Sequence, residues 1–266
     1  MSKLWTTFQI HYRLSAAYQV SVVLIESTRP TRTPLPVLIR QITVYPGVPP
    51  PFPTLTEITI PIPEPLRKLT TLLDLPKQQP SALLGSELLI KGHYLAGSSV
   101  QVHLTNQLLK KPMEIPIEGG TANEFKVTVP NKPADLSAGF YELTCRIAPS
   151  DQTTTRGERT TNALSLSLAP MIKAVKPKTL KRDAVLIVEC RPEVRGTQRV
   201  SLLLGDRELS PEARPAQTDS LRFRLKNVVS GTYFIRLRVD GVDSAFIDWN
   251  MVDENGAKIV DGILKK

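Results

Sequence analysis

The apolar residues of this chain repeat along the sequence, and this repeat constrains the fold more than any other feature. The second set of positions follows the first at offsets of 98, 100, 98 and 92 residues. The matched segments are Leu88–Ile90 with Leu186–Val188, Val100–Leu104 with Val200–Leu204, Phe125–Val127 with Phe223–Leu225, and Gly139–Tyr141 with Gly231–Tyr233. Self-similarity at one period indicates tandem copies of one domain. Because the copies agree in apolar and glycine-tyrosine positions and not in polar ones, the repeat predicts a shared fold and no shared binding site.

Each copy is expected to fold as a β-sandwich, because short alternating segments recur roughly every ten residues with glycine-containing turns between them. The strands predicted in the first copy are Leu88–Lys91, Val100–Leu104, Met113–Ile117, Phe125–Val129, Tyr141–Ile147 and Ala163–Leu168. Those predicted in the second copy are Val185–Glu189, Val200–Leu204, Leu221–Leu225, Tyr233–Val239 and Ser244–Trp249. Tyr141 and Tyr233 are each expected to close a corner of a sandwich by a hydrogen bond to main chain. Asn255-Gly256 predicts a further hairpin.

The opening of the chain predicts two strands that lack a partner. Its apolar side chains alternate with more polar ones, as in half-buried strands. A lone hairpin is marginal in water and leaves its edges open, so we expect the apolar set to contact another protein or another copy of this chain. The residues of this candidate interface are Trp5, Phe8, Tyr12, Leu14, Tyr18, Val20, Val22 and Leu24.

A proline-rich linker is expected to follow. Of the 23 prolines in the chain, 13 lie between Pro30 and Pro80, and proline fixes φ and donates no backbone hydrogen bond. Within the linker, Leu55–Ile62 predicts an edge strand and Pro65–Leu75 a short helix. The predicted organisation is therefore opening strands at 1–44, linker at 45–80, and two sandwich domains at 81–170 and 171–266.

Side chains that would support catalysis or metal binding are not arranged in any recognisable pattern. His93 and His103 could approach each other across neighbouring strands, but a third ligand is missing. Ser86 lacks the rest of a nucleophile elbow. The aspartates at 240, 243, 248 and 253, with Glu254, lack the spacing of a calcium loop and are expected in turns. We therefore expect no enzyme activity, no catalytic residue, no metal and no cofactor.

The formal net charge is +9, and the densest basic cluster is a candidate patch for anionic surfaces such as a membrane. Its residues are Lys173, Lys176, Lys178, Lys181 and Arg182. The alternative is a solvated linker, and the lack of interleaved aromatic residues argues against nucleic acid. Cys145 and Cys190 fall in different predicted domains, which favours core thiols or a reducing compartment over a disulfide. The chain shows neither a signal peptide nor a membrane span, so we expect it in the cytoplasm.

The segment Tyr12–Leu38 resembles the end of the conserved domain of cap, or tail-terminator, proteins of extracellular contractile injection systems, which are phage-tail-like particles. The resemblance is carried by Tyr12, Leu14-Ser15, Tyr18-Gln19-Val20 and Pro34–Val37. Thr161-Asn162-Ala163, Ala169-Pro170 and the segment Gln198–Leu209 are similar to immunoglobulin-like repeats that follow this domain in long members. In that family the conserved domain begins far upstream, so this sequence is expected to carry only its last strands. Either the start codon is misassigned, or this is a truncated or split member.

The resemblance implies an all-β chain of two tandem immunoglobulin-like β-sandwiches, preceded by an incomplete β-hairpin and a proline-rich linker. It also implies a structural, non-enzymatic role like that of the cap protein. The expected partners are particle proteins, namely sheath, tube or a cap-domain protein, with the chain as a homohexamer in a particle that can be released from the cell. The alternative is a binding module that anchors a particle or partner to a surface or membrane. An enzyme with accessory sandwiches is disfavoured because paired carboxylates are missing.

Overall fold

The computed structural model describes residues 52–62, 79–149, 157–177, 184–205, 207–226, 232–245, 247–253, 256–259 and 263–265. All of these residues belong to the compact unit Pro50–Lys266. The described residues form strands and connecting turns without any helix, which confirms the predicted all-β class. None of them lies in a helix that is long and apolar enough to cross a membrane. The predicted opening strands and the helix at Pro65–Leu75 fall outside these ranges.

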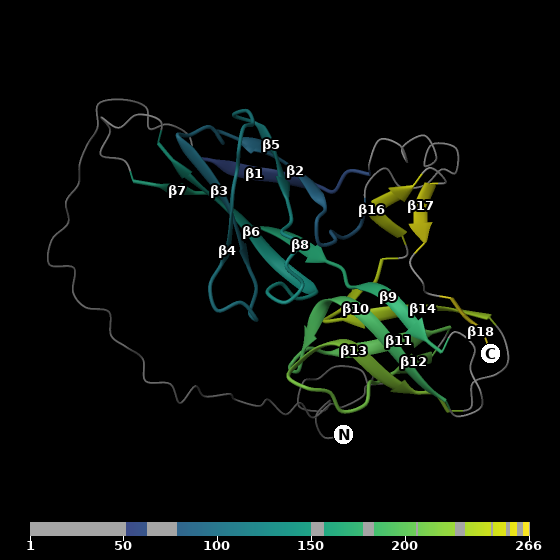
Figure 1. Ribbon diagram of the computed structural model, residues 1–266. Helices are drawn as coiled ribbons and strands as arrows, with labels where there is room; N and C mark the ends of the chain where they lie inside the picture. Colours follow the sequence, from purple (N-terminus) through teal and green to yellow (C-terminus); the bar gives the residue numbers. More distant parts are fainter. Residues whose placement is uncertain are drawn as a thin grey trace, which may run out of the picture. The chain divides into compact units, whose positions relative to one another are not determined.

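The first set of strands, called lobe 1 here, forms two antiparallel sheets around one core (Figure 1). One sheet is three-stranded in the order β1-β2-β5, and the other is five-stranded in the order β4-β3-β6-β7, with β8 also paired to β6. The bounds are β1 Thr54–Thr59, β2 Glu87–His93, β3 Ser99–Thr105, β4 Met113–Pro116, β5 Glu124–Thr128, β6 Gly139–Ala148, β7 Arg159–Thr160 and β8 Leu164–Leu168. Buried and exposed residues alternate along β6, as the period of a half-buried strand requires.

Lobe 2 repeats this strand order, which confirms the tandem repeat read from the sequence. Its three-stranded sheet runs β9-β10-β13, and its five-stranded sheet runs β12-β11-β14-β15 with β18 also paired to β14. The bounds are β9 Met171–Lys176, β10 Val185–Arg195, β11 Val200–Leu204, β12 Arg207–Leu209, β13 Gln217–Arg224, β14 Thr232–Val239, β15 Val242–Asp243 and β18 Ile263–Lys265. Each strand of lobe 2 therefore has a counterpart in lobe 1 with the same neighbours.

Three strands of the second copy differ clearly from the prediction. The predicted strand Leu221–Leu225 begins earlier and runs from Gln217 to Arg224 as β13. The predicted strand Val185–Glu189 continues to Arg195 as β10, passing through Pro192. The register with β13 shifts between Glu189 and Val194, and such an irregularity is where a strand tolerates proline. The predicted strand Ser244–Trp249 instead runs from Ile247 to Asp253 as β16. This strand pairs with β17 (Gly256–Ile259), which confirms the predicted hairpin.

The linker strand and the corner tyrosine are fixed by specific hydrogen bonds. β1 pairs with β2, as an edge strand should, and the side chain of Asn162 continues the pairing on the other side. Its Oδ1 accepts from Leu55 N at 2.7 Å and its Nδ2 donates to Leu55 O at 3.0 Å. At the predicted corner, Tyr141 Oη donates to Ser137 O at 2.7 Å and accepts from Ser137 N at 3.0 Å. Both groups are buried, so the corner is a structural site.

Replacing Tyr141 with Phe should destabilise lobe 1. The substitution leaves the buried N–H and C=O of Ser137 without this partner, at a cost of about 1–3 kcal/mol in the free energy of unfolding. Urea denaturation measures the change. Tyr94→Phe is the matched control, because Tyr94 is 52% exposed and should change the free energy of unfolding by less than about 0.5 kcal/mol. Equal effects of the two substitutions would contradict the corner assignment.

Cys145 and Cys190 are both free and buried, one in the core of each lobe. Burial raises the pKa of the Cys145 thiol from 9.0 to about 12. Burial, and secondarily the charge of Asp219, raises the pKa of Cys190 to about 12 as well. In each case the neutral thiol is the form that the folded chain favours.

These thiols should make stability fall at alkaline pH. Above pH 9 the unfolded chain loses thiol protons that the folded chain keeps until about pH 12, so the stabilisation is complete below pH 9 and is lost across this range. Each thiol contributes a slope of at most about 1.4 kcal/mol per pH unit. Urea denaturation from pH 8 to 11 should show a shallower loss for the double variant Cys145→Ala, Cys190→Ala. Identical slopes for the variant and the unaltered chain would contradict the assignment.

Candidate functional site

The candidate interface at the start of the chain, from Trp5 to Leu24, lies outside the described residues and remains a prediction. Of the candidate anionic-surface patch, the structure describes Lys173 and Lys176. Lys173 is exposed, whereas the Nζ of Lys176 lies 2.7 Å from Glu189 Oε1 on the neighbouring strand. One of the positive charges of the patch is therefore paired with a carboxylate of its own sheet. Lys178, Lys181 and Arg182 are outside the described ranges.

The two histidines that could have shared a metal lie on different sheets. His93 ends β2 in the three-stranded sheet, where its ring lies 6.5 Å from that of Tyr94. His103 is on β3 in the five-stranded sheet and is only 5% exposed. The approach across neighbouring strands, which the sequence allowed but did not favour as a metal site, is therefore absent. Among the described residues, His, Cys, Asp and Glu form no group of three that could hold a metal ion.

The main polar feature is the joint between the lobes, where lobe 2 binds the segment 130–138 that connects β5 to β6. Glu193 N donates to Pro133 O at 2.9 Å. Gln217 Nε2 donates to Ala134 O at 3.1 Å, and the guanidinium of Arg195 donates to the carbonyls of Ala134 and Asp135. All of these acceptors are main-chain oxygens. The joint therefore recognises the path of this segment and not its side chains.

Gln198 forms the buried centre of the joint. Its side chain is 4% exposed, and its Nε2 donates to Ala138 O of lobe 1 at 2.7 Å and to Asp240 Oδ2 at 2.8 Å. Its Oε1 accepts from Arg195 N at 2.9 Å. The other carboxylate oxygen of Asp240 accepts from Arg199 N at 2.8 Å. A buried amide costs free energy unless its polar atoms are paired, and here each of them is.

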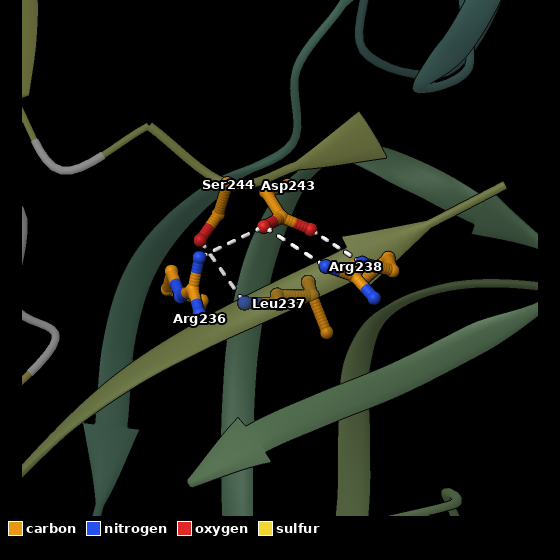
Figure 2. Close-up of polar contacts among 5 residues, drawn as sticks. All are labelled: Arg236, Leu237, Arg238, Asp243 and Ser244. Atoms are coloured by element: carbon orange, nitrogen blue, oxygen red, sulfur yellow. Dashed lines mark hydrogen bonds and ion pairs between the residues drawn. The ribbon is translucent and has the colours of Figure 1, made fainter. Parts of the chain in front are cut away.

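Asp240 is held in place by the turn between β14 and β15. Asp240 and Gly241 have φ values of 46° and 86°, and the carboxylate of Asp243 just beyond bridges Arg236 and Arg238 (Figure 2). Ser244 Oγ accepts from Leu237 N at 3.0 Å, and Ser244 N donates to Leu237 O at 2.7 Å. The hydrogen bond and charge of Asp243 raise the pKa of Arg238. Asp240 is thus a turn residue, as expected, and it contributes to the joint. Asp243 ends β15, and Asp248 and Asp253 lie in β16, so the expectation of turns is wrong for these three aspartates.

A cavity of about 830 Å³ opens beside the joint. Lobe 1 lines it with the end of β3 and the loop after it, the start of β6 and the start of β8. Lobe 2 contributes Thr197 and Asp240. The sequence did not predict this cavity, because its lining comes from segments far apart in the chain. The feature of the sequence that could have indicated the cavity is Phe140, an apolar residue at an outward position of an alternating strand.

Replacing Gln198 with Ala should loosen the joint. The buried carbonyl of Ala138 and the amide of Arg195 would lose their partner, which costs about 1–3 kcal/mol. Hydrogen exchange should then speed up in segments 133–138 and 193–199, and small-angle scattering should report a wider spread of interlobe distances. Gln107→Ala, at an exposed glutamine, is the control. Unchanged exchange in the Gln198 variant would contradict the role of this side chain.

Comparison with known proteins gives two family matches, each over less than half of the chain. Residues 167–260, which include most of lobe 2, match a domain of unknown function, DUF8756. Residues 1–39 match the Pvc16 N-terminal domain. Among curated proteins, none matches the chain.

Several solved structures are similar to the chain at low overall superposition. One is SGBP-B from a xyloglucan utilization locus in Bacteroides uniformis, with 16% identity, a TM-score of 0.25, and coverage of 73% of this chain and 48% of that one. Another is SGBP-B from a mixed-linkage glucan utilization locus of Bacteroides ovatus, with 12% identity, a TM-score of 0.27, and coverage of 70% and 43%. This chain therefore spans less than half of either structure. The match at residues 1–39 links the chain to proteins of phage-tail-like contractile injection systems.

Proposed function

We propose that this chain is a structural, non-enzymatic component of a contractile injection particle, similar to the cap or tail-terminator protein. The observation that carries the proposal is the match of residues 1–39 to the Pvc16 N-terminal domain. The apolar set from Trp5 to Leu24 lies within that match and would contact the particle, through sheath, tube or a cap-domain protein. The chain would stay with the particle in the cytoplasm and leave the cell with it.

The two lobes would act as a projecting arm of immunoglobulin-like domains. The two hydrogen bonds between Asn162 and Leu55 fix β1, the strand within the predicted linker, to the rest of lobe 1. The joint around Gln198 then fixes lobe 1 to lobe 2. Such an arm would hold the surface of lobe 2 away from the particle, at a fixed angle to lobe 1. If six copies assemble in a ring, weak contacts made by each arm add up through their shared attachment.

The proposal is tested by expressing the tagged chain together with the particle genes and sedimenting the particles. The tagged chain should co-sediment with particles, and immunogold labelling should mark the end opposite the baseplate. The variant Tyr18→Ser, Val20→Asp, Val22→Asp should lose at least about tenfold of this association, because a charge buried in an apolar contact is costly.

The control variant is Glu118→Gln, at an exposed position of lobe 1, which should co-sediment as the unaltered chain does. The lobes of the triple variant should keep their unfolding midpoint, which separates loss of attachment from loss of fold. A chain that stays in the supernatant, or gold particles spread along the sheath, would overturn the proposal.

A further inference from the structure

The cavity beside the joint has a floor made by one cross-strand row on the outer face of the five-stranded sheet. Thr105 of β3 lies opposite Glu142 of β6, and Glu142 lies opposite Ser165 of β8. All three side chains are exposed and line the cavity. The residues beside Glu142 in sequence, Tyr141 and Leu143, point the other way and are buried in the core. The floor therefore offers a carboxylate flanked by two hydroxyl groups.

An exposed aromatic ring borders this floor. Phe140 precedes Glu142 by two residues on the same face of β6 and is 56% exposed. Two residues along a strand span roughly 6.6 Å, so one ligand group can reach both the ring and the carboxylate. Asn106 holds the neighbouring loop in place, since its Nδ2 donates to Phe140 O at 2.7 Å and its Oδ1 accepts from Leu108 N at 2.8 Å.

The charge of the cavity is negative. The described residues that line it include the acidic Glu142 and Asp240 but no lysine, arginine or histidine. Asp240 already accepts two hydrogen bonds within lobe 2. Within the described part of the chain, Glu142 makes no ion pair or side-chain hydrogen bond. Other exposed glutamates, such as Glu57 and Glu87, are paired with lysines of neighbouring strands.

We propose that this cavity binds an arginine side chain of a partner protein. A guanidinium is planar, stacks on an aromatic face and donates two parallel hydrogen bonds to a carboxylate. Phe140 supplies the ring, Glu142 the carboxylate, and the hydroxyl oxygens of Thr105 and Ser165 accept the remaining N–H groups. The net charge of the lining disfavours phosphates and other anions. This site is independent of the N-terminal segment on which the proposed particle attachment rests.

The test is an NMR titration of the full chain with the peptide acetyl-Gly-Arg-Gly-amide, and with its uncharged citrulline analogue. The arginine peptide should shift the amide resonances of segments 105–108 and 140–142, and its binding should weaken as salt increases. The citrulline peptide, which has nearly the same shape, should bind at least about fivefold more weakly.

Glu142→Gln should weaken binding of the arginine peptide at least about fivefold, and Phe140→Ala about threefold. Glu118→Gln and Phe52→Ala are matched controls at exposed positions of the same unit and should leave the affinity unchanged. Because Glu142 is exposed, its variant should keep the resonances of the core in place. Equal binding of arginine and citrulline peptides, or full affinity in Glu142→Gln, would overturn the assignment. Shifts of these amide resonances with an uncharged oligosaccharide, cellohexaose, and none with the arginine peptide would also overturn the assignment.

Discussion

The pairing of buried polar groups at the joint is the constraint on which the arrangement of this chain depends. The amide of Gln198 is buried between two sandwiches, where an unpaired donor or acceptor costs free energy, and it binds Ala138 of lobe 1 and Asp240 of its own lobe. Asp240 lies in the turn after β14, and Asp243 beyond this turn forms ion pairs with Arg236 and Arg238 of β14. Leu83 and Ala138 of lobe 1 also pack into the core cluster of lobe 2. The two copies therefore form a joined pair, and not two independent modules on a flexible connection.

The repeat and most strands were predictable because alternation along a half-buried strand is a local signal. The prediction for β11, Val200–Leu204, agrees with the structure at both ends, and Tyr141 makes the expected corner bond. The prediction stopped β10 too early because Pro192 interrupts the local pattern, whereas the register shift of the sheet accommodates it. The sequence could not show that His93 and His103 lie on different sheets, because tertiary packing decides which sheet a strand joins.

The joint and its cavity could not be predicted from the sequence, although two of their residues lie in segments with a recognisable pattern. Gln198 opened a segment similar to the repeats of a known family, and Asp240 belonged to an acidic cluster with no clear ligand. Neither residue indicates its partners in the sequence, because Gln198 binds a main-chain carbonyl of the other copy and Asp240 binds groups of its own lobe that lie about 40 residues away in the chain. A repeat that conserves the fold can place its specific polar contacts between copies, where one copy uses side chains and the other uses backbone. Both lobes line the cavity, and Glu142 lies between Thr105 of β3 and Ser165 of β8 only after the sheet has formed.

We propose that the chain sits at one end of a contractile particle, attached by its N-terminal segment and carrying the two joined lobes. Cryo-electron microscopy of purified particles that carry the chain tests this claim most directly. We expect density at the end opposite the baseplate, with one pair of lobes per subunit of the ring and the same angle between the lobes in every copy. Particle ends without this density, or lobes that attach along the sheath, would contradict it.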